Sequence, residues 1–259
     1  MSLPQAVLLL VAGIAGGLSG SIAGLASLAT YPALLSMGLP PVTANVTNTV
    51  ALVFSSIGSV SGSRPELVGQ GRRLRPLAVA GATGAVIGAA LLLVTPGEAF
   101  ELVVPWLIGL ASVAILVRRP LIAVAVADAH ADVRLGAASH VPRNLLIGVG
   151  VIGIYAGYFG AGAGVMLLAL FLFMTGEVVA RANAAKNLVL GVSNGIAAVG
   201  LAIFGDVRWP YAAPLALGLL IGGRLGPVVV RRLPDGPLRV GIALAGVGLA
   251  LKLGSDAYR

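Results

Sequence analysis

The sequence lacks cysteine and is poor in charged side chains. None of the 259 residues is cysteine, and charged residues make up only 10% of the chain, against about 25% in an ordinary soluble protein. The first absence excludes a disulfide scaffold and a thiolate metal or redox centre. The second leaves too few charges to cover a soluble surface of this size, which argues against a soluble enzyme, a nucleic-acid-binding protein and a disordered chain.

Apolar residues dominate what is present. They account for 58% of the sequence, and the mean hydropathy is +1.01. Lys186 and Arg224 are the charges that lie inside the long apolar runs. We therefore predict an all-α polytopic membrane protein with about eight transmembrane segments, since a crossing helix needs about 20 apolar residues. The segments cover residues 3–38, 41–63, 77–97, 102–117, 144–176, 182–205, 209–230 and 240–251. The net charge of +8 then belongs to loops that flank the membrane.

Two of these segments, residues 3–38 and 144–176, are too long for one crossing helix. Each has a cluster of glycine and other small residues near its middle, at 16–24 and at 157–164. Glycine lowers helix stability by about 1 kcal/mol relative to alanine, so clusters of this density predict interrupted helices. The segments would then be discontinuous spanning helices or re-entrant hairpins. Close helix packing through small residues is the alternative interpretation.

The chain repeats part of itself. Residues 44–49, Ala-Asn-Val-Thr-Asn-Thr, recur at 182–187 as Ala-Asn-Ala-Ala-Lys-Asn, and each copy follows an overlong segment. We expect a duplicated four-segment unit, with a first transmembrane repeat at 1–117, a polar linker at 118–142 and a second repeat at 143–259. If all segments cross, which we favour, the repeats are parallel and the basic residues place both termini in the cytoplasm. If the glycine-rich segments are re-entrant, the repeats are inverted and both termini face outward.

Hydrogen-bond donors inside the apolar segments are the candidates for function. Lys186 needs a compensating role, because a lysine within a span costs at least about 2.5–3.5 kcal/mol on insertion. Snorkelling to the interface is its structural alternative. Arg224 is a second candidate cation, or else a residue at the membrane boundary. The repeated motif adds polar side chains that could instead join helices by hydrogen bonds. These are Asn45, Asn48, Thr49, Asn183 and Asn187.

The interrupted helices would supply backbone donors as well. Gly160, Gly162 and Gly164 lie in the second glycine cluster, and a helix that begins after a break presents free N–H groups and the positive end of its dipole. No aspartate or glutamate lies within an apolar segment, which argues against a cation pump. Donors without carboxylates predict a binding site for a small anion near the middle of the membrane, with no metal and no cofactor.

The second glycine cluster, Gly-Tyr-Phe-Gly-Ala-Gly-Ala-Gly, resembles the glycine-rich signature of the sulfite exporter TauE/SafE family. The repeated motif and the stretch Ile-Gly-Gly-Arg-Leu-Gly at 221–226 are also similar to the family, whereas the first cluster keeps Gly20 but has Leu25 in place of a glycine. The resemblance covers nearly the whole chain. It implies movement of sulfite, organosulfonates or related small anions across the bacterial inner membrane.

We therefore expect a secondary transporter for a small sulfur-containing oxyanion. An enzyme is not expected, because no nucleophile–base pair or set of metal ligands is visible. The expected partners are the anionic substrate and the lipid bilayer, with a homo-oligomer left open and no role for nucleic acid. A passive anion channel and a non-transporting membrane assembly factor are the alternative functions.

Overall fold

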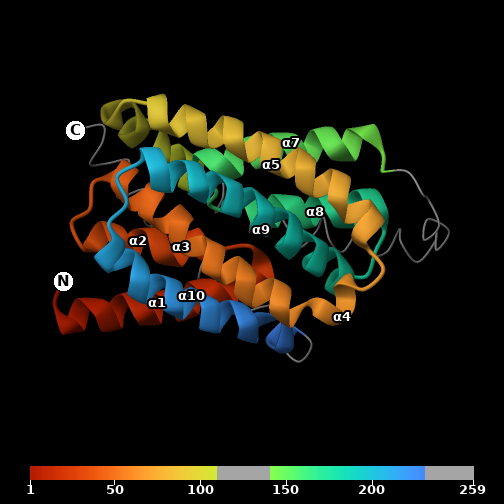
Figure 1. Ribbon diagram of the computed structural model, residues 1–259, viewed down its shortest axis with the longest axis horizontal. Helices are drawn as coiled ribbons and strands as arrows, with labels where there is room; N and C mark the ends of the chain where they lie inside the picture. Colours follow the sequence, from red (N-terminus) through yellow and green to blue (C-terminus); the bar gives the residue numbers. More distant parts are fainter. Residues whose placement is uncertain (110–140, 231–259) are drawn as a thin grey trace.

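The computed structural model describes residues 1–109 and 141–230, and this part of the chain is helical apart from short connections (Figure 1). Four of its helices are long and apolar enough to cross a membrane. The predicted all-helical, multi-pass membrane protein is confirmed. Most of the predicted linker and the segment predicted at 240–251 lie outside the described residues. The helices are α1 (Leu3–Ala23), α2 (Ala26–Ser36), α3 (Pro41–Gly62), α4 (Arg64–Leu67), α5 (Gly71–Val94), α7 (Arg143–Tyr158), α8 (Ala163–Thr175), α9 (Val179–Phe204) and α10 (Trp209–Val230), with a further helix at 97–109.

The first overlong segment folds into two antiparallel helices. α1 ends before Gly24, which adopts a left-handed φ of 78°, and α2 begins two residues later. Glycine suits this position because a residue with a side chain is strained at such a φ. α2 then runs back along α1, since a Cβ on Gly20 would touch Ala26 and a Cβ on Gly16 would touch Thr30. We call α1 and α2 together hairpin 1.

The second overlong segment folds in the same way. Gly160 and Gly162, between α7 and α8, both have a φ of 76°. α8 runs back along α7, since a Cβ on Gly148 would touch the side chain of Leu170. We call α7 and α8 together hairpin 2. The interruptions predicted at both glycine clusters are confirmed. At each interruption the chain folds back along the preceding helix, which differs from the discontinuous crossing helix that eight crossings require.

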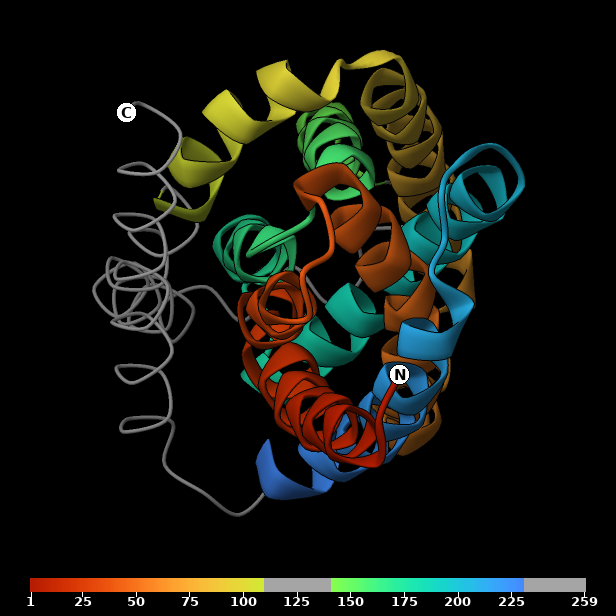
Figure 2. The ribbon, with the colours of Figure 1, turned by 90° about the vertical axis from the view of Figure 1, so that its left-hand side faces the viewer.

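The two hairpins enter the helical bundle from opposite ends (Figure 1). α1 and α7 run in opposite directions, and so do α3 and α9, and α5 and α10. The packing is paired in the same way: α1 packs on α10 as α7 packs on α5, and α3 packs on α10 as α9 packs on α5. Figure 2 shows the bundle from one end, with α1 and α10 together at the bottom and α5 and α7 together at the top.

Glycines allow these helix pairs to pack closely. A Cβ on Gly222 of α10 would lie 2.1 Å from the carbonyl oxygen of Ile14 in α1. A Cβ on Gly88 of α5 would lie 2.0 Å from the carbonyl oxygen of Ile154 in α7. Neither position has room for a side chain. The close approach of α1 to α10, and of α7 to α5, therefore depends on glycine at these positions.

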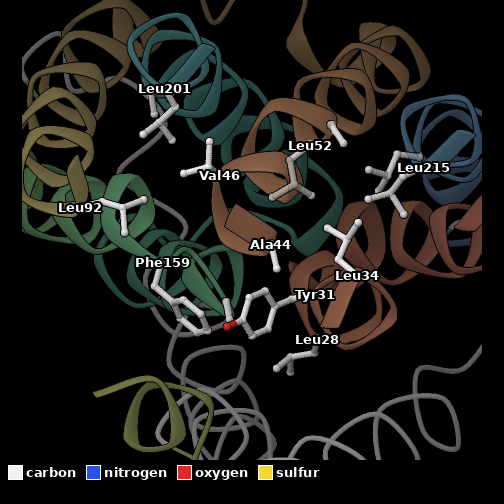
Figure 3. Packing of buried hydrophobic residues seen from close by; sticks show 14 of the residues in the cluster. Leu28, Tyr31, Leu34, Ala44, Val46, Leu52, Leu92, Phe159, Leu201 and Leu215 are labelled. Carbon is white, nitrogen blue, oxygen red and sulfur yellow. The ribbon is translucent and has the colours of Figure 1, made fainter. Parts of the chain in front are cut away.

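Apolar contacts fix the hairpins relative to one another (Figure 3). Tyr31 in α2 packs edge-on against Phe159 in the loop at the tip of hairpin 2, with the ring centroids 5.4 Å apart. Phe159 also packs against Phe100, at 6.1 Å between centroids. Ala44 and Val46, from the start of α3, belong to the same buried cluster. Edge-on aromatic pairs of this kind add directional contacts to the apolar burial.

Candidate functional site

The tips of the two hairpins touch through glycine backbone. A Cβ on Gly164 would lie 2.5 Å from the Cα of Gly24, and a Cβ on Gly24 would lie 2.3 Å from the carbonyl carbon of Gly164. The two interruptions therefore meet at one point inside the bundle, where neither glycine can carry a side chain. Helix ends carry backbone N–H and C=O groups that have no partner within their own helix, so this contact brings such groups into the interior.

Lys186 reaches this region from α9. Its side chain is fully buried, and Nζ donates hydrogen bonds to the carbonyl oxygens of Gly20 at 3.1 Å and Ser21 at 3.3 Å. Both carbonyls lie near the C-terminal end of α1, where the helix dipole is negative, so the ammonium compensates the end of an interrupted helix. The side chain points into the protein and not toward a membrane interface, as snorkelling would require.

Asn183 and Asn45, which occupy the same place in the repeated motif, bind the ends of opposite hairpins. Asn183 Nδ2 donates to the carbonyl oxygen of Ser21 in α1 at 3.0 Å, and Asn45 Nδ2 donates to that of Tyr158 in α7 at 2.8 Å. Both side chains are buried. Each half of the chain thus caps the interrupted helix of the other half. In this structure these amide N–H groups join helices, which is the interhelical role that polar side chains commonly have in membranes.

The other polar residues of the first motif copy are used within hairpin 1 and α3. Asn48 Nδ2 donates to Ser27 Oγ at 3.2 Å, and Asn48 Oδ1 accepts from Thr30 Oγ1 at 2.5 Å. These two bonds tie α3 to α2. The hydroxyl of Thr49 donates to the carbonyl oxygen of Asn45 in its own helix at 2.9 Å. Both hydrogen-bonding groups of the Asn48 amide are therefore occupied.

A small cavity with polar and apolar lining lies beside the hairpin tips, between α2, α3 and α9. Its volume is about 30 Å³, the scale of one or two water molecules. None of the residues that line it is charged. Its polar lining consists of the side chains of Ser27, Ser55, Ser56, Ser59, Asn187 and Asn194, next to the glycine backbone at Gly20, Gly24 and Gly160.

The cavity offers hydrogen-bond donors and positive potential to a ligand. Ala26 and Ser27, which line it, are the first residues of α2 and carry the N–H groups at the positive end of that helix. Asn187 Nδ2 makes only a long bond, 3.4 Å to Ser63 Oγ, so a ligand can compete for this amide. Lys186 adds a positive charge behind Gly20. A small anion with several oxygen acceptors fits this chemistry.

The structure brings together only part of the predicted set. Gly160 and Asn187 line the cavity. Lys186 and Asn183 hold the end of α1 directly behind it. The side chain of Arg224, on α10, is exposed and is not among the lining residues. The binding roles of the predicted residues stay predictions.

The serines of α3 are lining residues that the sequence interpretation missed. Ser55 and Ser59 stand four residues apart, which places them on one face of the helix, and Ser56 lies beside them. This spacing was the available signal. It is a weak one, because small hydroxyl residues are common wherever membrane helices pack closely.

Charged side chains join helix ends at the margins of the bundle. Arg73 at the start of α5 forms a salt bridge with Glu177, which stands between α8 and α9. Asp206 forms a salt bridge with Arg208 Nη2 and accepts a hydrogen bond from Thr43 Oγ1, each at 3.2 Å. These contacts tie together elements from different parts of the chain, and they lie apart from the cavity.

Interrupted helices that meet inside the bundle, together with a small cavity at their ends, are typical of multi-pass membrane proteins of the transporter class. Sequence comparisons agree with this class. The model of the family described as "Sulfite exporter TauE/SafE" matches residues 8–253, and the chain belongs to this family. Family membership also supports the expectation that the protein is not an enzyme.

Two bacterial relatives are similar over nearly their whole length. The chain is 28% identical over 260 residues to "Probable membrane transporter protein ORF9" of Sinorhizobium sp, covering 96% of this chain and 92% of that protein. It is 27% identical over 256 residues to "Probable membrane transporter protein YfcA" of Escherichia coli (strain K12), covering 97% and 90%. No solved structure matches the chain.

Proposed function

We propose that the protein is a secondary transporter that moves a small sulfur-containing oxyanion, such as sulfite or a sulfonate, across the bacterial inner membrane. The observation that carries the proposal is the cavity at the hairpin tips. The start of α2 and the amide of Asn187 line this cavity, and the buried Lys186 ammonium binds the carbonyl oxygen of Gly20, another lining residue. None of its lining residues is acidic. The family supports the substrate class through its description as a sulfite exporter.

The proposed architecture is a pair of inverted repeats, residues 1–117 and 143–259. Each repeat consists of one re-entrant hairpin and three crossing segments. An odd number of crossings gives the repeats opposite orientations, and the opposite directions of the two hairpins in Figure 1 support this arrangement. The charge distribution then places both termini outside the cell membrane.

The contact between the hairpin tips suggests how the site is exposed. Each tip reaches the cavity from its own end of the bundle, and the tips touch at Gly24 and Gly164. A movement of one hairpin would open the cavity toward one side of the membrane while the other hairpin stays closed. Rocking of one repeat against the other around a fixed site is the usual form of alternating access.

Anion flux into proteoliposomes tests the proposal. With purified protein, we expect saturable uptake of sulfite or of at least one sulfonate. Asn187→Leu should lower this uptake by roughly tenfold, because it removes a donor from the cavity. The same replacement at Asn144, which is exposed at the start of α7, is the matched control and should transport normally. Absence of flux for every anion in a broad sulfur-oxyanion panel would overturn the proposal.

The two alternative functions give different results in the same system. A passive anion channel would produce resolvable single-channel currents and flux that does not saturate. A membrane assembly factor would show no flux, and its Asn45, Asn48 and Asn183 variants would lose expression together with cellular function.

A further inference from the structure

The ends of α1 and α7 occupy matching places in the two halves, but among the described residues only the end of α1 binds a positively charged side chain. At the end of α1, Lys186 Nζ binds the carbonyl oxygens of Gly20 and Ser21. In the other copy of the motif the position of Lys186 is taken by Asn48, whose side chain binds α2. Among the described residues, no ammonium or guanidinium hydrogen-bonds to the last turn of α7. The negative end of its dipole therefore lacks the compensation that α1 receives.

Asn45 leaves a buried oxygen unused beside this end of α7. Its Nδ2 donates to the carbonyl oxygen of Tyr158 at 2.8 Å. This bond fixes the orientation of the amide, because the flipped amide would place two oxygens against each other. Oδ1 of the same amide has no hydrogen-bond partner, although the side chain is only 1% exposed. A buried acceptor of this kind calls for a donor or a cation.

The matching asparagine shows which feature separates the two halves. Asn183 Oδ1 is also buried without a partner, so the unused oxygen is common to both sites. The difference is the charge at the neighbouring helix end, which Lys186 supplies for α1 and no described residue supplies for α7. Amide oxygens together with the carbonyl oxygens of interrupted helix ends are ligands that hold Na⁺ in other transporters, so the lack of carboxylates is no obstacle.

We propose that a monovalent cation, Na⁺, binds at the C-terminal end of α7, with Asn45 Oδ1 and carbonyl oxygens of the last turn as ligands. Lys186 occupies the matching place in the other half as a tethered cation. Binding of Na⁺ stands on these contacts alone. Coupling of Na⁺ binding to anion movement rests on the proposed function. The bound Na⁺ would then partly neutralise the charge of the anion as it crosses the membrane.

Na⁺-dependent stability of the purified protein tests the binding. At constant ionic strength, the unfolding temperature should rise with Na⁺ more than with K⁺ or N-methyl-D-glucamine. Asn45→Ala should weaken the apparent Na⁺ affinity roughly tenfold or more, because it removes a buried ligand. Asn183→Ala makes the same change at the matching place and should keep the Na⁺ affinity. Equal effects of the three cations, or an unchanged affinity in Asn45→Ala, would overturn the inference and leave a bound water as the partner of Oδ1.

A second variant pair keeps the test decisive if Asn45→Ala fails to fold. Asn48→Lys places an ammonium where Lys186 stands in the other half, and it should abolish the response to Na⁺. Asn48→Met has a similar length without the charge and should keep the response. A normal Na⁺ response in Asn48→Lys would contradict the proposal.

Flux measurements separate this inference from the proposed function. Anion flux that is the same in Na⁺ and in N-methyl-D-glucamine would overturn the coupling and leave the transporter proposal standing. Specific Na⁺ binding without flux of any anion would overturn the transporter proposal and leave the Na⁺ site standing.

Discussion

The two carbonyl oxygens that accept from Lys186 Nζ, those of Gly20 and Ser21, each have a second donor. The carbonyl oxygen of Gly20 also accepts from the backbone N–H of Gly24 at 2.7 Å. The carbonyl oxygen of Ser21 also accepts from Asn183 Nδ2 at 3.0 Å. Both oxygens therefore keep a donor when the ammonium is removed. A neutral replacement at this position removes the charge without leaving either of these two carbonyl oxygens unpaired, and an unpaired buried acceptor is the costlier kind of loss.

Lys186→Met therefore tests the charge itself. Methionine keeps most of the length and apolar volume of the side chain, so we expect the unfolding temperature to change little. Anion flux should fall roughly 10- to 100-fold, the loss expected when a charged hydrogen-bonding group is removed. Flux and thermal unfolding are measured on the same preparation, with Lys186→Arg as the charge-conserving control. Flux at the wild-type rate in Lys186→Met would show that the ammonium serves only to cap α1.

At this scale the sequence predicts which polar residues are buried better than it predicts what they bind. Lys186 and the asparagines of the motif are all buried, as donors inside apolar segments should be. Their positions in the sequence do not reveal that Asn45 caps α7 or that Asn183 caps α1, because those partners lie more than a hundred residues away. The partners follow from the tertiary contact between the two halves.

At the scale of helices, the glycines at the hairpin tips have two separate tasks. Gly24, Gly160 and Gly162 take left-handed backbone conformations that end or begin a helix. Gly164 has no such conformation, and its role is to let the other hairpin approach, since its hypothetical Cβ would lie 2.5 Å from the Cα of Gly24. Substitution of Gly164 therefore probes the contact between the tips without forbidding the turn.

We expect Gly164→Ala to destabilise the protein by about 1–3 kcal/mol, because overpacking at a rigid backbone contact forces the two hairpins apart. Anion flux should fall with the displacement of the tips. Gly200→Ala is the matched control: this glycine also lies in a helix, but a Cβ there would meet nothing within 4 Å. Its effect should stay within about 1 kcal/mol. Chemical unfolding in detergent measures both variants, and equal stabilities would contradict the observed contact.

The interruptions could be predicted from the sequence, whereas the direction of the chain after each interruption could not. A dense glycine cluster weakens a helix locally, and both breaks fall at the predicted clusters. The return of α2 along α1 depends on contacts such as Gly16 with Thr30. Such contacts form only in the folded protein and leave no periodic pattern, so a crossing helix and a hairpin are equally compatible with the composition.

At the scale of the whole molecule, the corresponding helices of the two halves run in opposite directions (Figure 1), as the proposed inverted repeats require. α3 and α9 carry the two motif copies and run in opposite directions through the bundle (Figure 1). Each delivers an asparagine to the hairpin of the other half. Basic residues alone could not decide between parallel and inverted repeats, because both arrangements leave an excess of them on one side.

Cysteine labelling can decide the topology, because the chain has no cysteine of its own. Ser2 and Ser36, at the two ends of hairpin 1, are both exposed, and so are Asn144 and Val178, at the two ends of hairpin 2. If the hairpins are re-entrant, single cysteines at the first pair should react with a membrane-impermeant maleimide from one side of the membrane. Cysteines at the second pair should react from the other side.

Eight crossings would give a different labelling pattern. Each overlong segment would then separate its own pair, so that Ser2→Cys reacts from the same side as Asn144→Cys, and Ser36→Cys reacts from the same side as Val178→Cys. Labelling in intact and in permeabilised cells distinguishes the two patterns without any assumption about substrate. Because the hairpin tips touch inside the bundle, we expect the first pattern, in which each hairpin enters and leaves the membrane on one side.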